Sequence, residues 1–205
     1  MARKERYAVS QDFVDQCTEV LSEFGAVRRS SFVKFIQKNL EIPSEKAEQI
    51  LEKLAQRKDV FLAKYADTTI VKSASCNRAT YKNLDAFEAY ISILEHETSP
   101  EEKITAFINK ATFPADFVIY VTSGIIYNVF VYDPKNLMQK LSIFSRKVKD
   151  SESQVTLIVF PVGTDLQHVR VPKLEGKYRY AVVRKSSTGK AVCSITEIQG
   201  EKKND

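Results

Sequence analysis

Hydrophobic positions recur at helical spacing through the first sixty residues. Apolar side chains between Ser10 and Phe24 fall three or four residues apart, Ser10 is placed to cap the start, and Gly25 is placed to end the helix. The segment RSSFVKFIQKN repeats this spacing. Pro43 opens PSEKAEQILEKLAQRKD, because proline suits the first position of a helix. The pattern therefore predicts three short helices in succession.

The pattern then changes to two short runs of the kind found in strands. They are Val60–Lys64 and Thr69–Lys72, with Asp67 in the turn between them, which predicts a hairpin. Three short helices followed by a two-stranded hairpin have the order of a winged helix-turn-helix. We predict that domain for residues 1–75.

The remainder alternates between helical and strand-like segments. A linker and a helix from Leu84 to His96 fill residues 76–99, a further helix begins at Ser99 and ends near Asn109, and another runs from Pro134 to Val148. The strand-like runs are FVIYV, IIYNVFVY, VTLIVF, YRYAVVR and AVCSITEI. Several are continuously apolar, which is typical of strands covered on both faces. We predict a mixed-sheet α/β domain over residues 100–198 and a frayed charged tail at 199–205.

Composition narrows the classes of function. The chain is 43% hydrophobic with a formal net charge of +5, which permits binding to nucleic acid without requiring it. No apolar run has membrane-spanning length and the first residues lack an apolar signal core, so a cytoplasmic location without membrane association is expected. The three cysteines and two histidines have no metal-ligand spacing, so no cofactor, metal or disulfide is predicted.

One pattern resembles a catalytic site. Asp116, Asp133 and Lys135 have the outline of a metal-dependent nuclease, in which carboxylates hold Mg²⁺ beside a lysine. Pro134 argues against it, because Asp133-Pro134 is a typical helix start that would carry Lys135 away from a strand. The SSTGK segment fits a hairpin turn, and His168 fits a surface pair with Arg170. We therefore predict no catalytic residue and keep a Mg²⁺-dependent nuclease as an alternative.

A winged helix usually places its third helix in the major groove of DNA and its hairpin on the backbone. The outward face of the predicted third helix holds Glu45, Gln49, Glu52 and Gln56, and its glutamates would repel phosphates. Lysines and arginines elsewhere in the first domain supply candidate anchors. The predicted DNA contacts are Arg28, Arg29, Lys46, Gln49, Lys53, Lys64 and Lys72.

Four segments carry a resemblance over most of the chain: VLSEFGAV, AEQILEKLAQRKDVFLAK, FPADFVIYV with YNVFVYD, and KYRYAVV. Together they are similar to winged-helix proteins of mobile genetic elements in Gram-positive bacteria, related to the replication-relaxation group. The resemblance implies a winged helix joined to a restriction-endonuclease-like domain that has lost its active site. It also implies association with plasmid or transposon DNA.

These observations lead to three hypotheses. The first is a non-enzymatic DNA-binding protein whose second domain is a platform for a protein partner or a homodimer. The second is a protein-interaction adaptor that does not bind DNA. The third is the nuclease that uses Asp116 and Asp133.

Overall fold

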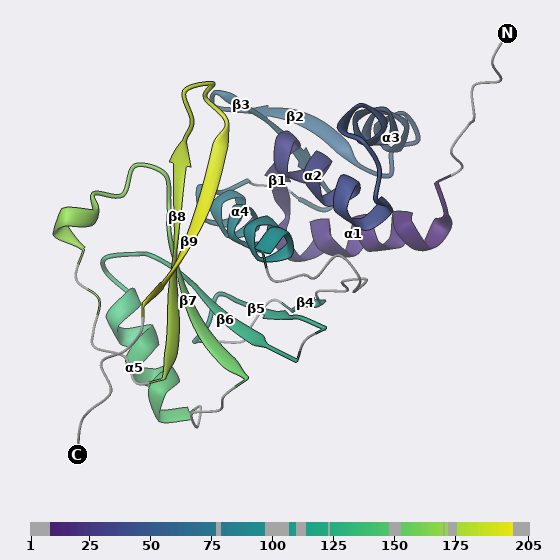
Figure 1. Ribbon diagram of the computed structural model, residues 1–205. Coiled ribbons are helices and arrows are strands. Elements are labelled where there is room, and N and C mark those ends of the chain that lie inside the picture. Colours follow the sequence, from purple (N-terminus) through teal and green to yellow (C-terminus); the bar gives the residue numbers. More distant parts are fainter. Residues whose placement is uncertain are drawn as a thin grey trace, which may run out of the picture. The chain divides into compact units, whose positions relative to one another are not determined.

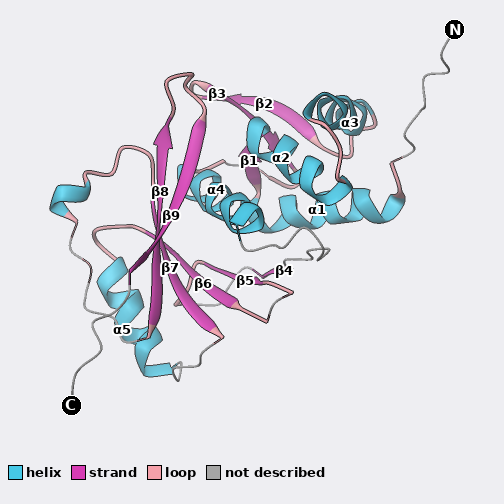
Figure 2. Ribbon diagram, in the orientation of Figure 1, coloured by secondary structure: helices cyan, strands magenta, loops and turns pink. Residues whose placement is uncertain are grey.

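The computed structural model of the chain describes residues 9–76, 79–96, 107–109, 114–122, 124–147, 153–169, 171 and 176–198. The chain divides into two units, Met1–Ala79 and Thr80–Asp205 (Figure 1). The division falls inside the segment 76–99, and the helix of that segment belongs to the second unit. Helices and strands are present in both units, so the protein is a mixed α+β protein (Figure 2).

The first helix, α1 (Gln11–Phe24), follows from its end signals and its apolar stripe. The Ser10 hydroxyl accepts a hydrogen bond from the Phe13 N–H at 3.3 Å. Gly25 ends the helix at φ 73°, in the left-handed region that favours glycine, and its N–H donates to the Leu21 carbonyl at 2.8 Å. The start, the end and the buried stripe were all predicted from the sequence and are confirmed.

Two more helices follow, α2 (Arg29–Leu40) and α3 (Ser44–Gln56). Both bury the stripes that the periodicity predicts, since Phe32, Ile36 and Leu51 are fully buried. Pro43 differs from the prediction by one position, because it precedes α3 in an extended conformation and does not occupy the first helical turn. Its carbonyl still accepts the N–H groups of Lys46 and Ala47 and so begins the helical ladder.

Three strands complete the first unit. They are β1 (Ala26–Arg28), β2 (Phe61–Tyr65) and β3 (Thr68–Lys72), in the antiparallel order β1-β3-β2. The β2–β3 hairpin confirms the predicted pair of strands. Strand β1 was not predicted, because three residues are too short to show a period.

The second unit is built on a six-stranded sheet. Its strands, in the order in which they lie, are β4 (Phe107–Asn109), β5 (Phe117–Tyr120), β6 (Ile126–Val131), β7 (Gln154–Phe160), β8 (Lys177–Lys185) and β9 (Ala191–Ile198). β6, β7 and β8 are parallel to one another, and the other pairs are antiparallel. The predicted mixed sheet is therefore confirmed.

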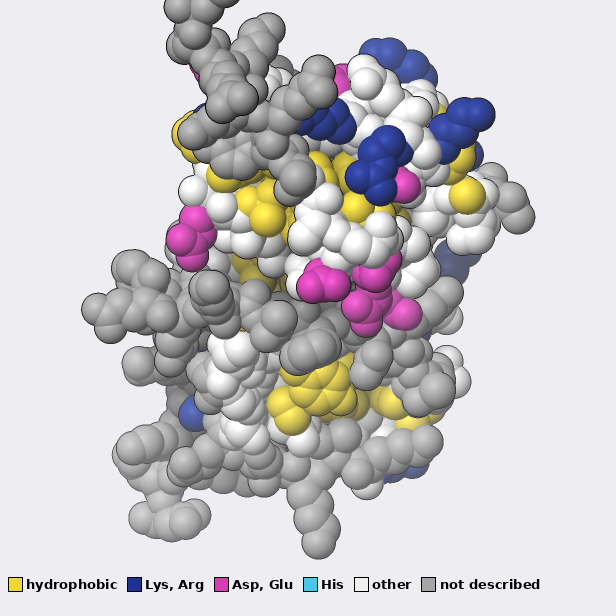
Figure 3. All heavy atoms as spheres, turned by 90° about the vertical axis from the view of Figure 1, so that its right-hand side faces the viewer, with side chains coloured by type: hydrophobic (Ala, Val, Ile, Leu, Met, Phe, Trp, Pro, Cys, Tyr) yellow, Lys and Arg dark blue, Asp and Glu magenta, His cyan; other side chains and the backbone are white. Residues whose placement is uncertain are grey.

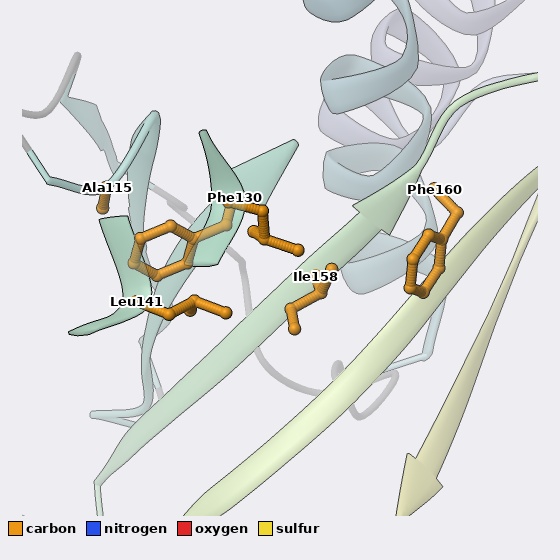
Figure 4. Packing of buried hydrophobic residues seen from close by; sticks show 6 residues of the cluster. Ala115, Phe130, Leu141, Ile158 and Phe160 are labelled. Carbon is orange, nitrogen blue, oxygen red and sulfur yellow. The ribbon is translucent and has the colours of Figure 1, made fainter. Parts of the chain in front are cut away.

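Helices cover both faces of this sheet. Helix α4 (Tyr81–His96) packs against β6, β7, β8 and β9. Helix α5 (Leu137–Lys147) places Leu137 and Leu141 in a core cluster with Phe130, Ile158 and Phe160 (Figure 4). A short 3-10 turn, Leu166–His168, follows β7. Side chains of a strand point alternately to its two faces. The buried residues of β6 and β7 that lie between the cluster residues therefore point to the opposite face of the sheet.

Two predicted helices need correction in the second unit. The helix expected from Ser99 to Asn109 is wrong at its end, because Phe107–Asn109 form strand β4 paired with β5, while residues 97–106 lie outside the described part of the chain. The helix expected to begin at Pro134 begins at Leu137, because residues 134–136 form a turn. In the described part of the chain, every helix is too short or too polar to cross a membrane.

Candidate functional site

The exposed face of α3 combines both signs of charge. Gln49 and Lys53 are exposed as predicted, and Lys46 is half-buried. The Lys53 side chain has no hydrogen-bond or ionic partner among the described residues, so its ammonium group is available to a ligand. Glu45 and Glu52 share the exposed surface of the same helix and reduce its attraction for an anion.

Arg29 is already engaged by two carboxylates of α3. Its guanidinium forms an ion pair with Glu48 and a second ion pair with Glu52, the latter at 3.0 Å. A phosphate would have to compete with both carboxylates for this guanidinium. Arg29 also neutralises part of the negative charge on the exposed face of α3, which was predicted to repel the phosphates of DNA.

Two other predicted contacts are placed unfavourably. Arg28 lies in β1 and is only 6% exposed, so its side chain is not on a surface that a duplex reaches. In β1, Arg28 is paired with Ile70 of β3, and its burial argues against this predicted contact. Lys72 is half-buried, and its Nζ donates to the Cys76 carbonyl at 3.3 Å.

The β2–β3 hairpin presents Lys64 openly. Lys64 pairs with Thr69 next to the turn of the hairpin, it is exposed, and it has no side-chain partner among the described residues. Between α3 and this hairpin, Lys58 is also exposed, whereas Arg57 is bound to Asp59 at 2.9 Å. Lys58 was not among the predicted DNA contacts, although the run of basic residues at the end of α3 could have indicated it.

Charge is distributed unevenly over the surface. On the face drawn in Figure 3, several Lys and Arg side chains lie near one another, and several Asp and Glu side chains form a separate group. Within the first unit, the exposed side of α1 carries Asp12, Asp15 and Glu19 and has no lysine or arginine. The basic residues therefore occupy only part of the surface of this unit.

The second unit contains a buried carboxylate held by two lysines. Asp116 has a side chain only 5% exposed, and one of its oxygens forms ion pairs with Lys82 of α4 and with Lys140 of α5, the latter at 2.6 Å. Its other oxygen accepts the Val131 N–H at 2.9 Å. These contacts join α4, α5 and strand β6 to the start of β5.

Asp133 and Lys135, the other two residues of the nuclease hypothesis, are bound to each other in a local turn. The carboxylate of Asp133 accepts the Lys135 N–H at 3.0 Å and the Asn136 side-chain amide at 2.6 Å. These two hydrogen bonds are the main cause of a lowered pKa of Asp133. Asp133 therefore caps the turn that leads into α5. Lys82 and Lys140, the partners of Asp116, were not predicted, because they are 34 and 24 residues from it in the sequence.

A hollow of about 390 Å³ lies where β6 and β7 end. It is lined by Tyr132, Pro134, Val162, Gly163, Thr164, Asp165 and His168. His168 Nδ1 is 2.8 Å from a carboxylate oxygen of Asp165, so the partner of His168 is Asp165, and Arg170 lies outside the described residues. Both side chains are largely exposed, at 82% and 62%, and water therefore competes for their hydrogen bonds.

Searches for related proteins give no support from homology. No known protein family, curated protein or solved structure matches the chain. Among the described residues, histidine, cysteine, aspartate and glutamate side chains form no group of three that could hold a metal ion.

Proposed function

We propose that the first unit is a winged helix that binds the phosphate backbone of duplex DNA without strong sequence preference. The order of α1, α2, α3 and the β2–β3 hairpin supports this proposal, because a winged helix presents its third helix and its hairpin to DNA. The observation that carries it is the pair of available lysines, Lys53 on α3 and Lys64 on the hairpin.

Weak sequence preference follows from the rest of the surface. Gln49 is the exposed α3 side chain best suited to reading a base edge, since glutamine pairs with adenine in two hydrogen bonds. The neighbouring glutamates oppose a close approach of the helix to phosphates, and Arg29 is held by two of them. Backbone contacts by lysine therefore dominate, and such contacts fix position without reading sequence.

The second unit acts in this proposal as a non-catalytic platform for a partner or a second copy. What supports this role is the state of Asp116, whose oxygens are engaged by Lys82, Lys140 and the Val131 N–H. A metal ion would have to displace two lysines from this carboxylate. Metal-dependent cleavage of plasmid DNA by the purified chain with Mg²⁺ or Mn²⁺, abolished by Asp116→Asn, would refute the non-enzymatic part of the proposal.

The DNA proposal is tested by the salt dependence of binding. Each phosphate contact contributes about 0.9 to the slope of log affinity against log salt concentration. The double variant Lys53→Gln/Lys64→Gln should reduce that slope by about 1.8, measured by fluorescence anisotropy with a random duplex. The single variant Lys64→Ala should lower it by about 0.9 and weaken binding equally for different sequences.

A matched control removes the same charge elsewhere. Lys135 and Arg146 are exposed residues of the second unit near the two ends of α5, and Lys135→Gln/Arg146→Gln also lowers the net charge by two. This control should leave the slope unchanged. An unaltered slope in the Lys53/Lys64 variant would rule out the proposed contacts.

The adaptor function remains a second candidate, because the exposed face of α1 is acidic. Asp12, Asp15 and Glu19 lie on a helix without basic residues, which suits a basic protein surface. Gel filtration of the chain alone and with random duplex at low salt separates the two functions. Co-elution with DNA favours the first candidate, and a chain that elutes alone from such a mixture favours the second.

A further inference from the structure

The turn between β8 and β9 is an exposed basic feature of the second unit. The sequence from Tyr180 to Thr196 contains Arg184, Lys185 and Lys190 and has no aspartate or glutamate. Arg184 and Lys190 are exposed, and neither has an ionic or hydrogen-bonding side-chain partner among the described residues. Both charges are therefore available to an anion.

The end of this hairpin projects beyond its sheet. β7 pairs with β8 only as far as Val182, whereas β8 and β9 remain paired to Lys185 and Ala191. Figure 1 shows the end of the hairpin reaching past the other strands of the same sheet. A protruding two-stranded ribbon has dimensions that fit a groove of duplex DNA.

The register places the two available charges on one face. Arg184 is opposite Val192, and Ser186 is opposite Lys190 through a hydrogen bond from the Ser186 N–H to the Lys190 carbonyl at 2.8 Å. Arg184 and Lys190 are thus diagonal neighbours, about 7–8 Å apart at their Cα atoms. Val192 is 51% exposed, so no described helix covers this face at the end of the hairpin.

Hydroxyl groups extend the same surface. The Ser186 and Thr188 side-chain oxygens are 2.9 Å apart, and the Gly189 N–H donates to the Ser186 carbonyl at 2.9 Å, which closes the turn. Gly189 has φ 77°, which favours glycine at this position of the turn. Serine and threonine hydroxyls commonly join lysine and arginine in contacts to phosphate oxygens.

We infer that the β8–β9 turn is a second contact to the phosphate backbone of duplex DNA, made by Arg184 and Lys190. The inference rests on the proposed DNA-binding function and extends it to the second unit. It gives a role to the SSTGK segment, which the sequence explains only as a turn. The contact recognises charge and therefore adds affinity without sequence preference.

The decisive experiment compares three double variants in the full chain by anisotropy with a random duplex over 50–200 mM salt. Arg184→Gln/Lys190→Gln should reduce the slope of log affinity against log salt by about 1.8. Over this fourfold change in salt, the ratio of wild-type to variant affinity should then fall about twelvefold. Lys135→Gln/Arg146→Gln should show neither effect, and Lys53→Gln/Lys64→Gln tests the first unit separately.

The outcomes separate the two proposals. If only the Lys53/Lys64 variant loses slope, the hairpin contact is refuted and the function of the first unit stands. If only the Arg184/Lys190 variant loses slope, the hairpin contact stands and the contact by the first unit is refuted. If the wild-type chain does not bind duplex at 50 mM salt, both are refuted.

A direct measurement uses a photoreactive residue at the tip of the turn. With p-benzoylphenylalanine in place of Ser187, irradiation should crosslink the chain to bound duplex. The same residue in place of Met138, which is 49% exposed on α5, should give no crosslink. Equal crosslinking at both positions would contradict a specific contact at the turn.

Discussion

Replacing Asp116 with alanine should strongly destabilise the second unit, because its carboxylate has three partners in the folded protein. The Val131 N–H would lose its acceptor, at a cost of about 1–3 kcal/mol for an unsatisfied buried group. Lys140, with a side chain only 18% exposed, would lose its counter-charge at a cost of about 1–2 kcal/mol. Lys82 is 45% exposed, so solvent screening limits its loss to below about 1 kcal/mol.

The expected total is about 3 kcal/mol. For a unit of the size of Thr80–Asp205, each kcal/mol lowers the melting temperature by about 4 °C, so a decrease of about 12 °C is expected. Differential scanning calorimetry suits the measurement, because it resolves two transitions if the units unfold separately.

Asp116→Asn is the matched control for this prediction. Asparagine keeps an oxygen that can accept the Val131 N–H but removes the charge that holds the two lysines. This substitution should lower the free energy of unfolding by about 1–2 kcal/mol. The difference between the two variants then separates the contribution of the hydrogen bond from that of the ion pairs. A decrease below 3 °C for Asp116→Ala would refute the reasoning that this carboxylate fastens α4 and α5 to the sheet.

Three further predictions concern capping, thiol chemistry and packing. Asp133→Ala should cost about 1 kcal/mol at neutral pH. Because hydrogen bonds lower the pKa of Asp133 from its ordinary 3.8, this difference is present above that value and should vanish as the pH falls through the lowered pKa in urea titrations. Burial raises the pKa of Cys17 and of Cys193 to about 12, so both thiols should react with Ellman's reagent at pH 8 only after unfolding, and rapid reaction of the native protein would contradict this. Phe130→Ala should cost about 3–5 kcal/mol in chemical denaturation, because the ring is fully buried and stacks edge-on against Phe144, whereas the exposed Met138→Ala should cost below about 0.5 kcal/mol.

Much of the first unit was predictable because its signals are local. A serine cap, a glycine stop and apolar residues at helical spacing lie within one segment and act there, as in α1. The β2–β3 hairpin follows for the same reason, since its two strands are separated only by a turn. Strands β1 and β4 were not predicted. Each has only three residues and is defined by its hydrogen bonds to the neighbouring strand.

The candidate site was predictable only in part. Lys53 and Lys64 are exposed, because their positions on a helix and a strand decide which way they point. Arg28 and Arg29 are adjacent in the sequence and carry the same charge. Nevertheless, Arg28 is buried in a strand, whereas Arg29 binds two glutamates of α3. Neither outcome can be read from a single segment.

The sequence by itself determined α1, α2, α3 and the β2–β3 hairpin, together with their order along the chain. The tertiary structure alone decided that Lys82 and Lys140 meet Asp116, and that the end of the β8–β9 hairpin stands clear of its sheet. The physical reason is the range of the interactions. Backbone hydrogen bonding and side-chain periodicity act over a few residues, whereas ion pairing and burial depend on which distant segments folding brings together.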